Sequence, residues 1–217
     1  MYTLHEPHQE RNARFLIPRW FGLVSAAVLW GIVESGCSNG KQGHAASSSW
    51  KSAPVLTASL SPEVQLGDFA MQPPAGFSLS QKQMNSRDGK GELCIFTGPQ
   101  HPNGQSAQIY MMIGNDGGHM SSKVTSDQTT TMCLRMVASE HLNSRTTALQ
   151  SGTIGDMPFS RGYWTGIGKE TGKVFHGAVY TASSAPDIVQ VFIKDTEPYN
   201  TQEMPLLEAS VQTLRKR

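Results

Sequence analysis

The sequence is short of charge, and its charges nearly cancel. Only 16% of the 217 residues are charged, and 18 Lys and Arg against 17 Asp and Glu leave a formal net charge of +1. From Leu66 onward, basic and acidic residues are equal in number. A nucleic-acid-binding surface needs many phosphate contacts from Lys and Arg. This neutral body therefore argues against nucleic acid as a partner.

Repeats, multiple long apolar runs and catalytic motifs are also absent. The sequence lacks the Gly-X-Y period of collagen, the heptads of a coiled coil and the several apolar stretches of a multi-span membrane protein. It has no Gly-x-Ser-x-Gly elbow and no His-Glu-x-x-His zinc pair. The length suits one domain of ordinary size. We expect a protein that is not an enzyme.

The first 37 residues have the order of a secretory signal. Arg11, Arg14 and Arg19 precede an uncharged, mostly apolar run of fourteen residues, Trp20–Val33. As a helix this run would be about 21 Å long, which is short of the roughly 30 Å apolar core of a bilayer. We therefore expect residues 1–37 to hold a signal that is cleaved rather than left as a permanent span, and that sends the rest of the chain across the membrane.

The signal ends on Ser35-Gly36-Cys37, where a bacterial lipoprotein carries its lipidated cysteine. This ending resembles a lipobox, and the resemblance implies lipidation of Cys37 and anchoring on the periplasmic, extracytoplasmic face of a bacterial membrane. Glu34 departs from the pattern, which normally has Leu or a similar apolar residue there. Ordinary cleavage, or an uncleaved N-terminal helix as membrane anchor, therefore stays open beside lipidation.

Residues 38–65 have the composition of a flexible tether. Small and polar residues dominate, as in Ser47-Ser48-Ser49, and they cannot bury enough apolar surface to fold alone. Trp50, Val55 and Leu56 are exceptions that could dock on the body or touch lipid. We expect the folded domain to span residues 66–217.

Alternation of apolar and polar residues predicts eight short strands in this domain. In the clearest one, Ala107, Ile109, Met111 and Ile113 share one face at a period of two. Short connections between successive strands indicate antiparallel pairing. The predicted strands are Phe69–Gln72, Phe77–Gln81, Glu92–Thr97, Ala107–Ile113, Ala148–Ile154, Phe159–Thr165, Lys173–Thr181 and Ile188–Lys194.

Two helices are expected to cover the sheet. The first spans Thr125–His141, where Thr125 and Gln128 fit a capping box. The second ends near Arg215 and begins at Asn200 or at Pro205, with Pro205 favoured for the first turn. The sum is an α+β domain with an antiparallel sheet of six to eight strands and helices packed on it.

The stretch Phe69-Ala-Met-Gln-Pro-Pro-Ala-Gly-Phe77 resembles the opening strand and Pro-Gly turn of PsbP-like domains. The ending is similar too, with an apolar strand at Ile188–Ile193 and a terminal helix over Leu206–Leu214. This family includes extrinsic photosystem II proteins, a Ran-binding nuclear import factor and mycobacterial lipoproteins of the LpqN type. The resemblance covers roughly residues 66–217. It implies an α/β/α sandwich that serves as a non-enzymatic binding or assembly module, and it assigns no metal-binding or partner-binding residue.

Few residue clusters of this sequence suggest chemistry. The glycine-rich segment Gly166–Lys173 misses the spacing of a phosphate loop and is predicted to be a hairpin loop. The seven histidines lack the close spacing of a metal site on one element, so no metal or other cofactor is expected. Asp116 and His119 could share a ligand, but a plain loop is favoured over this weak pair.

Cys94 and Cys133 remain once Cys37 is assigned to lipid. An oxidising compartment permits a disulfide between them. Two separately buried thiols are the favoured interpretation, because a buried cysteine behaves as a small apolar residue.

These patterns favour a membrane-tethered, extracytoplasmic, non-catalytic domain that binds another protein or supports an envelope assembly. The first alternative is a small-ligand-binding lipoprotein, with the ligand between sheet and helix near Tyr110, Met112 and Tyr163. A second alternative is an enzyme of unknown class. The aromatic residues Tyr163, Trp164, Phe175, Tyr180 and Phe192 are interpreted as core or cross-strand pairs rather than as a ligand cage.

Overall fold

In the computed structural model the chain divides into two units, Met1–Ser38 and Asn39–Arg217. The structure describes residues 48–50, 59–86, 89–115, 125–184 and 187–217, all of them in the second unit. The predicted signal, with Cys37, and most of the predicted tether lie outside these residues. Within the described ranges, no helix is both long enough and apolar enough to cross a membrane.

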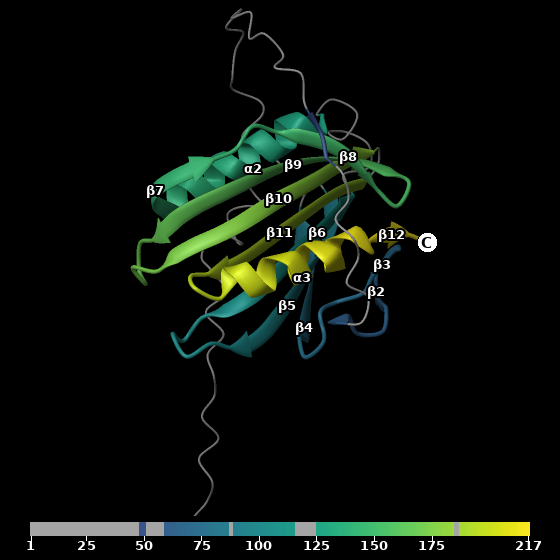
Figure 1. Ribbon diagram of the computed structural model, residues 1–217. Coiled ribbons are helices and arrows are strands. Elements are labelled where there is room, and N and C mark those ends of the chain that lie inside the picture. The colour runs from purple at the N-terminus through teal and green to yellow at the C-terminus, as the bar shows by residue number, and fades with distance from the viewer. Residues whose placement is uncertain (1–47, 51–58, 87–88, 116–124, 185–186) are drawn as a thin grey trace, which may run out of the picture. The chain divides into compact units, whose positions relative to one another are not determined.

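A mixed but mostly antiparallel sheet of nine strands forms the centre of the second unit (Figure 1). Its only parallel pairing joins β1 to β8, and β7 continues the outer side of β9 beyond β8. The strand order is β1 (Ser48–Ser49), β8 (Gln150–Ile154), β9 (Met157–Gly168), β10 (Val174–Ser184), β11 (Asp187–Thr196), β6 (Ser106–Asn115), β5 (Gly89–Gln100) and β4 (Ser78–Ser86), with β7 at His141–Thr146.

Two helices cover opposite faces of this sheet. Helix α2 (Ser126–Glu140) packs on β7, β9 and β10, where the Thr130 hydroxyl bonds the Thr181 hydroxyl at 2.6 Å. Helix α3 (Asn200–Gln212) packs on β11, β6 and β10. Because neighbouring residues of a strand face opposite ways, Tyr180 points away from α2 and joins the core beneath α3. The predicted α+β class and α/β/α layering are confirmed.

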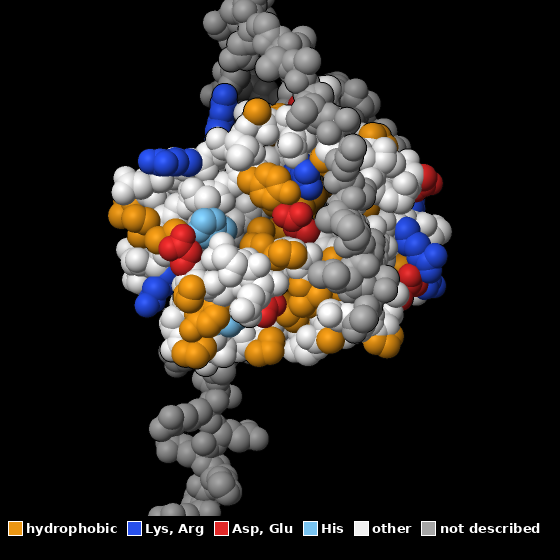
Figure 2. All heavy atoms as spheres, viewed as in Figure 1, with side chains coloured by type: hydrophobic (Ala, Val, Ile, Leu, Met, Phe, Trp, Pro, Cys, Tyr) orange, Lys and Arg blue, Asp and Glu red, His pale blue; other side chains and the backbone are white. Residues whose placement is uncertain are grey.

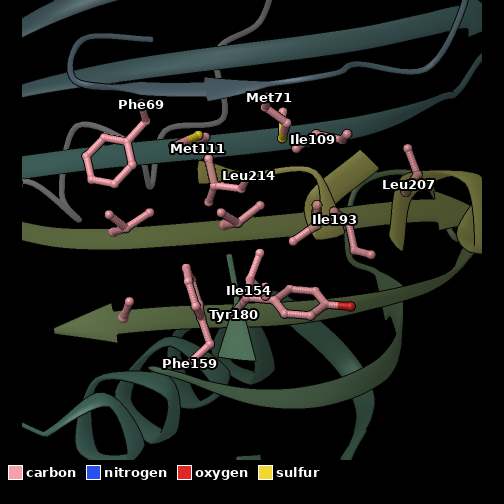
Figure 3. Packing of buried hydrophobic residues seen from close by; sticks show 14 of the residues in the cluster. Phe69, Met71, Ile109, Met111, Ile154, Phe159, Tyr180, Ile193, Leu207 and Leu214 are labelled. Atoms are coloured by element: carbon pink, nitrogen blue, oxygen red, sulfur yellow. The ribbon is translucent and has the colours of Figure 1, made fainter. Parts of the chain in front are cut away.

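The main core lies between the sheet and α3 (Figure 3). Large side chains from the sheet meet the buried side of α3, and Leu214 follows the helix into the same cluster. A small sheet of β2 (Val64–Leu66), β3 (Phe69–Met71) and β12 (Arg215–Lys216) closes one side. Its contribution includes Phe69 and Met71, which are almost completely buried.

The helix termini test the sequence predictions directly. Helix α2 has the expected capping box, in which the Gln128 backbone N–H donates to Thr125 Oγ1 at 3.2 Å and the Thr125 N–H donates to Gln128 Oε1. Helix α3 begins at Asn200, and Pro205 lies inside it rather than in its first turn. The Tyr199 carbonyl fixes this earlier start, because it accepts hydrogen bonds from the N–H groups of Gln202 and Glu203.

The folded domain begins before the expected boundary at Leu66. Strand β2 starts at Val64, and Leu60 already pairs with Pro74 through an isolated bridge. Strands β4 to β11 make eight, within the predicted six to eight, and β1 adds a ninth from inside the predicted tether. The short strands β1, β2, β7 and β12 were not predicted. Strands β1, β2 and β12 have only two or three residues, too few to show alternation. Strand β7 has six residues, but Leu142 is its one apolar residue.

Candidate functional site

The candidate site surrounds a buried arginine on the sheet face beneath α3. Arg161 of β9 is only 8% exposed. It lies between its cross-strand partners Gln150 on β8 and Tyr180 on β10, and Tyr163 follows two residues later on the same face. We call this cluster the Trp50–Arg161 site; it consists of Trp50, Gln150, Gly152, Arg161, Tyr163, Tyr180 and Glu208.

The guanidinium of Arg161 is held by aromatic rings and one neutral amide. Its Nε and Nη2 groups donate to Gln150 Oε1 at 3.1 and 2.7 Å. Its central carbon lies 4.5 Å from the Trp50 ring centroid, 4.9 Å from that of Tyr163 and 5.9 Å from that of Tyr180. Among the ion pairs of the described residues, none includes Arg161. Cation–π attraction and the Gln150 amide therefore supply its close contacts, and the Glu208 carboxylate interacts with its charge from beyond ion-pair distance.

Trp50 reaches this site from the segment that was predicted to be a tether. Ser48 and Ser49 pair in parallel with Gln150 and Ser151, and the Trp50 N–H donates to the Ser151 carbonyl at 3.2 Å. The indole lies against Gly152, where an added Cβ would be only 2.5 Å from Trp50 Cε2. It also meets the Tyr180 ring edge-on, with ring centroids 6.0 Å apart and an angle of 89° between the ring planes. The indole can therefore pack against the backbone here only because residue 152 has no side chain.

One polar atom of the site has no hydrogen-bond partner among the described residues. Trp50 Nε1 is buried and unpaired, although a buried donor without a partner costs about 1–3 kcal/mol. The Tyr180 hydroxyl is also buried and has Arg161 and Tyr163 as polar neighbours. Burial, followed by the charge of Glu208, raises the pKa of Tyr180 well above its usual value. Both groups therefore remain protonated donors around neutral pH.

Glu208 of α3 lies beside this cluster and is half-buried. Burial raises the pKa of its carboxyl group, while the Tyr163 hydroxyl and the charge of Arg161 lower it by less. Burial and the Glu208 charge together raise the pKa of Tyr163 to about 12. In the space-filling view, basic, acidic and hydrophobic side chains meet near the middle of this face (Figure 2). The site thus offers fixed donors and aromatic surface, with an acid at its margin.

A second polar cluster lies near the start of α3. His101 Nε2 and Asp195 Oδ1 are 3.0 Å apart, and the His101 ring stacks on Tyr199 with centroids 4.1 Å apart. Asp195 is fully buried; burial raises the pKa of its carboxyl group, and a backbone bond from Thr196 and the nearby His101 oppose that rise. No described hydroxyl or thiol bonds to His101, so the pair lacks the nucleophile of a catalytic triad.

The histidines of the described chain do not gather around a common point. His176 Nε2 lies 2.8 Å from Glu197 Oε1, and the His141 ring packs against Trp164 with ring centroids 4.7 Å apart. No group of three or more His, Cys, Asp or Glu is placed to hold a metal ion in these ranges. His5, His8, His44, Asp116 and His119 lie outside the described residues.

Cys94 and Cys133 are separate buried thiols. Cys94 shares a cross-strand row with Met111, Val191 and Tyr180, which places it on the α3 face of the sheet. Cys133 lies on α2, on the other face. The sheet stands between the two sulfurs, so the disulfide considered from the sequence is not formed. Burial raises the pKa of both thiols to about 12.

The predicted ligand position between Tyr110, Met112 and Tyr163 does not exist as one site. Tyr110 pairs through Phe192 with Val179, on the α2 face. Tyr163 pairs with Ala178, on the α3 face. The prediction failed because it needed the register of four strands, which the sequence does not reveal. The segment Gly166–Lys173 was predicted to be a hairpin loop, and it does connect β9 to β10, but Gly166–Gly168 belong to β9 and the loop itself is limited to residues 169–173.

Arg161 was missed by the sequence analysis, and so was its aromatic surround. Tyr163 and Tyr180 were interpreted as core or cross-strand pairs, and they do pack in or against the core; what the interpretation lacked is the buried cation that both of them face. One signal was available: a charged residue at an inward-facing position of a strand, two residues before a tyrosine. Charges at such positions are rarely buried without a specific partner.

Comparison with known proteins supports the fold through solved structures. No family model matches the chain, and no curated protein matches it. Among solved structures, the cyanobacterial PsbP protein of Synechocystis (CyanoP) has a TM-score of 0.51 at 8% identity, over 74% of this chain and 94% of that one. The chain therefore has a PsbP-like fold, as its resemblance to that family implied.

Weaker similarities extend to other bacterial proteins. LpqN of Mycobacterium tuberculosis, described as involved in cell envelope biogenesis, has a TM-score of 0.47 at 12% identity, over 70% of this chain and 87% of that one. A Pseudomonas aeruginosa protein of unknown function, described as a putative regulator, has a TM-score of 0.42 at 10% identity, over 73% of this chain and 97% of that one.

Proposed function

We propose that this protein is a membrane-tethered, extracytoplasmic, non-catalytic domain that binds another protein of the bacterial envelope. The observation that carries the proposal is the Trp50–Arg161 site, where a buried cation has aromatic neighbours and no carboxylate within ion-pair distance among the described residues. Arginine and aromatic side chains dominate the binding energy of protein interfaces. Such a cluster suits recognition better than turnover.

The N-terminal sequence supports the location. Three arginines, a short apolar run and a lipobox-like ending at Cys37 are typical of a lipoprotein precursor. We propose that Cys37 becomes the lipidated first residue of the mature chain. The mass of the intact, membrane-extracted protein should carry a diacylglycerol, and Cys37→Ser should lose it. A full-length, unlipidated chain in the soluble cell fraction would overturn the tethering.

Site-directed photo-crosslinking in intact cells tests the binding function. A photoreactive phenylalanine analogue replaces Tyr163, which is half-buried in the site. The matched control replaces Gln83, which is exposed on β4. We expect a reproducible crosslinked partner from position 163, little from position 83, and loss of the product when Arg161→Gln is added. A chain that gives no crosslink at either position would contradict the proposal.

A further inference from the structure

The Trp50–Arg161 site already holds an occupant in this structure. That occupant is an extended piece of chain, Ser48–Trp50, which precedes the other described residues in the sequence. Its contacts are of two kinds. Backbone pairing joins it to β8, and the indole fills the space between Gly152, Arg161 and Tyr180.

This combination is the physical pattern of strand addition. In that mode an extended peptide continues the edge of a sheet, its backbone supplies affinity, and a pocket reads one side chain. Strand β8 is the edge that receives the peptide, because its other side pairs with β9. The flat space over Gly152 is the pocket, and the Arg161 guanidinium forms a cation–π contact with the ring it receives.

The present occupant is held by few contacts. Only two of the five β8 residues pair with β1, and one further backbone bond comes from Trp50. The indole nitrogen of Trp50 has no partner in the site. Gly152–Ile154 of β8 have no strand on their outer side within the described part of the chain. A longer segment with an aromatic residue would pair with more of this edge than Ser48–Trp50 does.

We infer that the Trp50–Arg161 site is a recognition site for an extended segment of a partner protein that adds to β8 and inserts an aromatic side chain over Gly152, and that Ser48–Trp50 occupies it intramolecularly until it is displaced. This inference rests on the proposed protein-binding function and names the partner's chemistry. It also links the tether to recognition, since binding releases the segment that leads toward Cys37.

The test uses the full-length chain and a labelled peptide with the sequence of residues 46–52, Ala-Ser-Ser-Ser-Trp-Lys-Ser. In fluorescence anisotropy, the Trp50→Ala protein should bind this peptide because its site is vacant. The native protein should bind it about tenfold more weakly or worse, because a linked competitor acts at millimolar effective concentration. A peptide with Ala in place of Trp should not bind either protein.

Matched glycine variants separate the pocket from the rest of the molecule. In the Trp50→Ala background, Gly152→Ala should weaken peptide binding about tenfold or more, because 2.5 Å is too short for a carbon–carbon contact. Gly114→Ala is the control, since its Cβ would meet nothing nearer than 4.0 Å. Equal binding by native and Trp50→Ala proteins, or binding of the Ala peptide, would overturn the inference.

These outcomes are independent of the crosslinking experiment. If the analogue at position 163 crosslinks a partner while the Trp peptide does not bind the vacant site, the protein-binding function is supported and the strand-addition mode is contradicted. If the peptide binds and no partner is crosslinked in cells, the site recognises only its own tether, and the proposed function fails.

Discussion

The two ends of the main sheet are protected in different ways. At one end, β4 presents nine residues with no further strand beside it in the described chain, and Ser78–Gln83 are all exposed. At the other end, β8 is short, and Ser48–Ser49 cover part of it. An open edge invites pairing with other chains. One edge is therefore left polar and open, whereas the other is occupied.

The side chains explain the contrast. Strand β4 carries mostly Ser and Gln, with a single charge at Lys82 and an exposed apolar side chain at Leu79. A lysine on an edge strand discourages edge-to-edge association. Beside β8, in contrast, an aromatic ring and a buried guanidinium are in contact. The difference is that β4 is a polar edge with a charge, whereas β8 is paired with a segment of the same chain.

Removing the occupant of β8 should have the largest effect on stability. We expect Trp50→Ala to lower the free energy of unfolding by about 3 kcal/mol, because a large buried aromatic side chain is lost. Urea unfolding measures this change. Leu79→Ala on β4 is the matched control, since this side chain is 37% exposed and its loss should cost less than about 0.5 kcal/mol. Equal effects of the two changes would remove the distinction between the edges.

Narrowing the pocket should have a smaller effect. Gly152→Ala should destabilise the protein by about 2 kcal/mol, since overpacking typically costs 1–3 kcal/mol. The backbone at Gly152 does not have a positive φ, so any loss reports on the clash with Trp50. The same change in the Trp50→Ala protein should be nearly neutral. A loss of about 2 kcal/mol in the Trp50→Ala protein as well would show that the added methyl group clashes with something other than Trp50.

The pH dependence of stability should change in Glu208→Gln. The pKa of Glu208 is raised in the folded state, so folding disfavours its ionised form. The ionised carboxyl group therefore lowers the free energy of unfolding above the folded-state pKa, and this loss disappears as the pH falls below the ordinary pKa of 4.5. We expect Glu208→Gln to be more stable than the native protein at pH 7 and indistinguishable from it below about pH 4. Urea unfolding across this range would show the reverse if Glu208 stabilised the site as an ion.

The smallest effect on stability is expected on the open edge. Lys82→Val should change the free energy of unfolding by less than about 0.5 kcal/mol, because the side chain is exposed. It should, however, promote concentration-dependent association, since the only charge of β4 is lost. Sedimentation velocity measures this, with Gln83→Val as the control that keeps Lys82. Monomers at all concentrations would mean that the charge does not protect β4.

Local sequence patterns predicted most of the longer strands and both described helices, but not the site. Period-two alternation placed the strand from Ala107 to Ile113 inside β6, and the capping box placed the start of α2 at Thr125. Both are local signals. The site, in contrast, joins β8, β9, β10, α3 and the segment at Trp50, so it depends on pairing register and on a long-range contact.

Trp50 itself shows where local reasoning stops. Its surroundings, serine on one side and Lys51-Ser52 on the other, indicate a solvated linker. The ring is nevertheless only 8% exposed, because Gly152 leaves a flat surface and Arg161 lies beneath it. No local pattern in the sequence indicates that Gly152 or Arg161 contacts Trp50.

Amide hydrogen exchange at Trp50 tests the central claim most directly. We expect the Trp50 N–H, which donates to the Ser151 carbonyl, to exchange much more slowly than an unstructured amide in the native protein. Arg161→Gln should remove most of this protection while the amides between β9 and β10 stay protected. Exchange of the Trp50 amide at the unstructured rate in the native protein would contradict an occupied β8 edge.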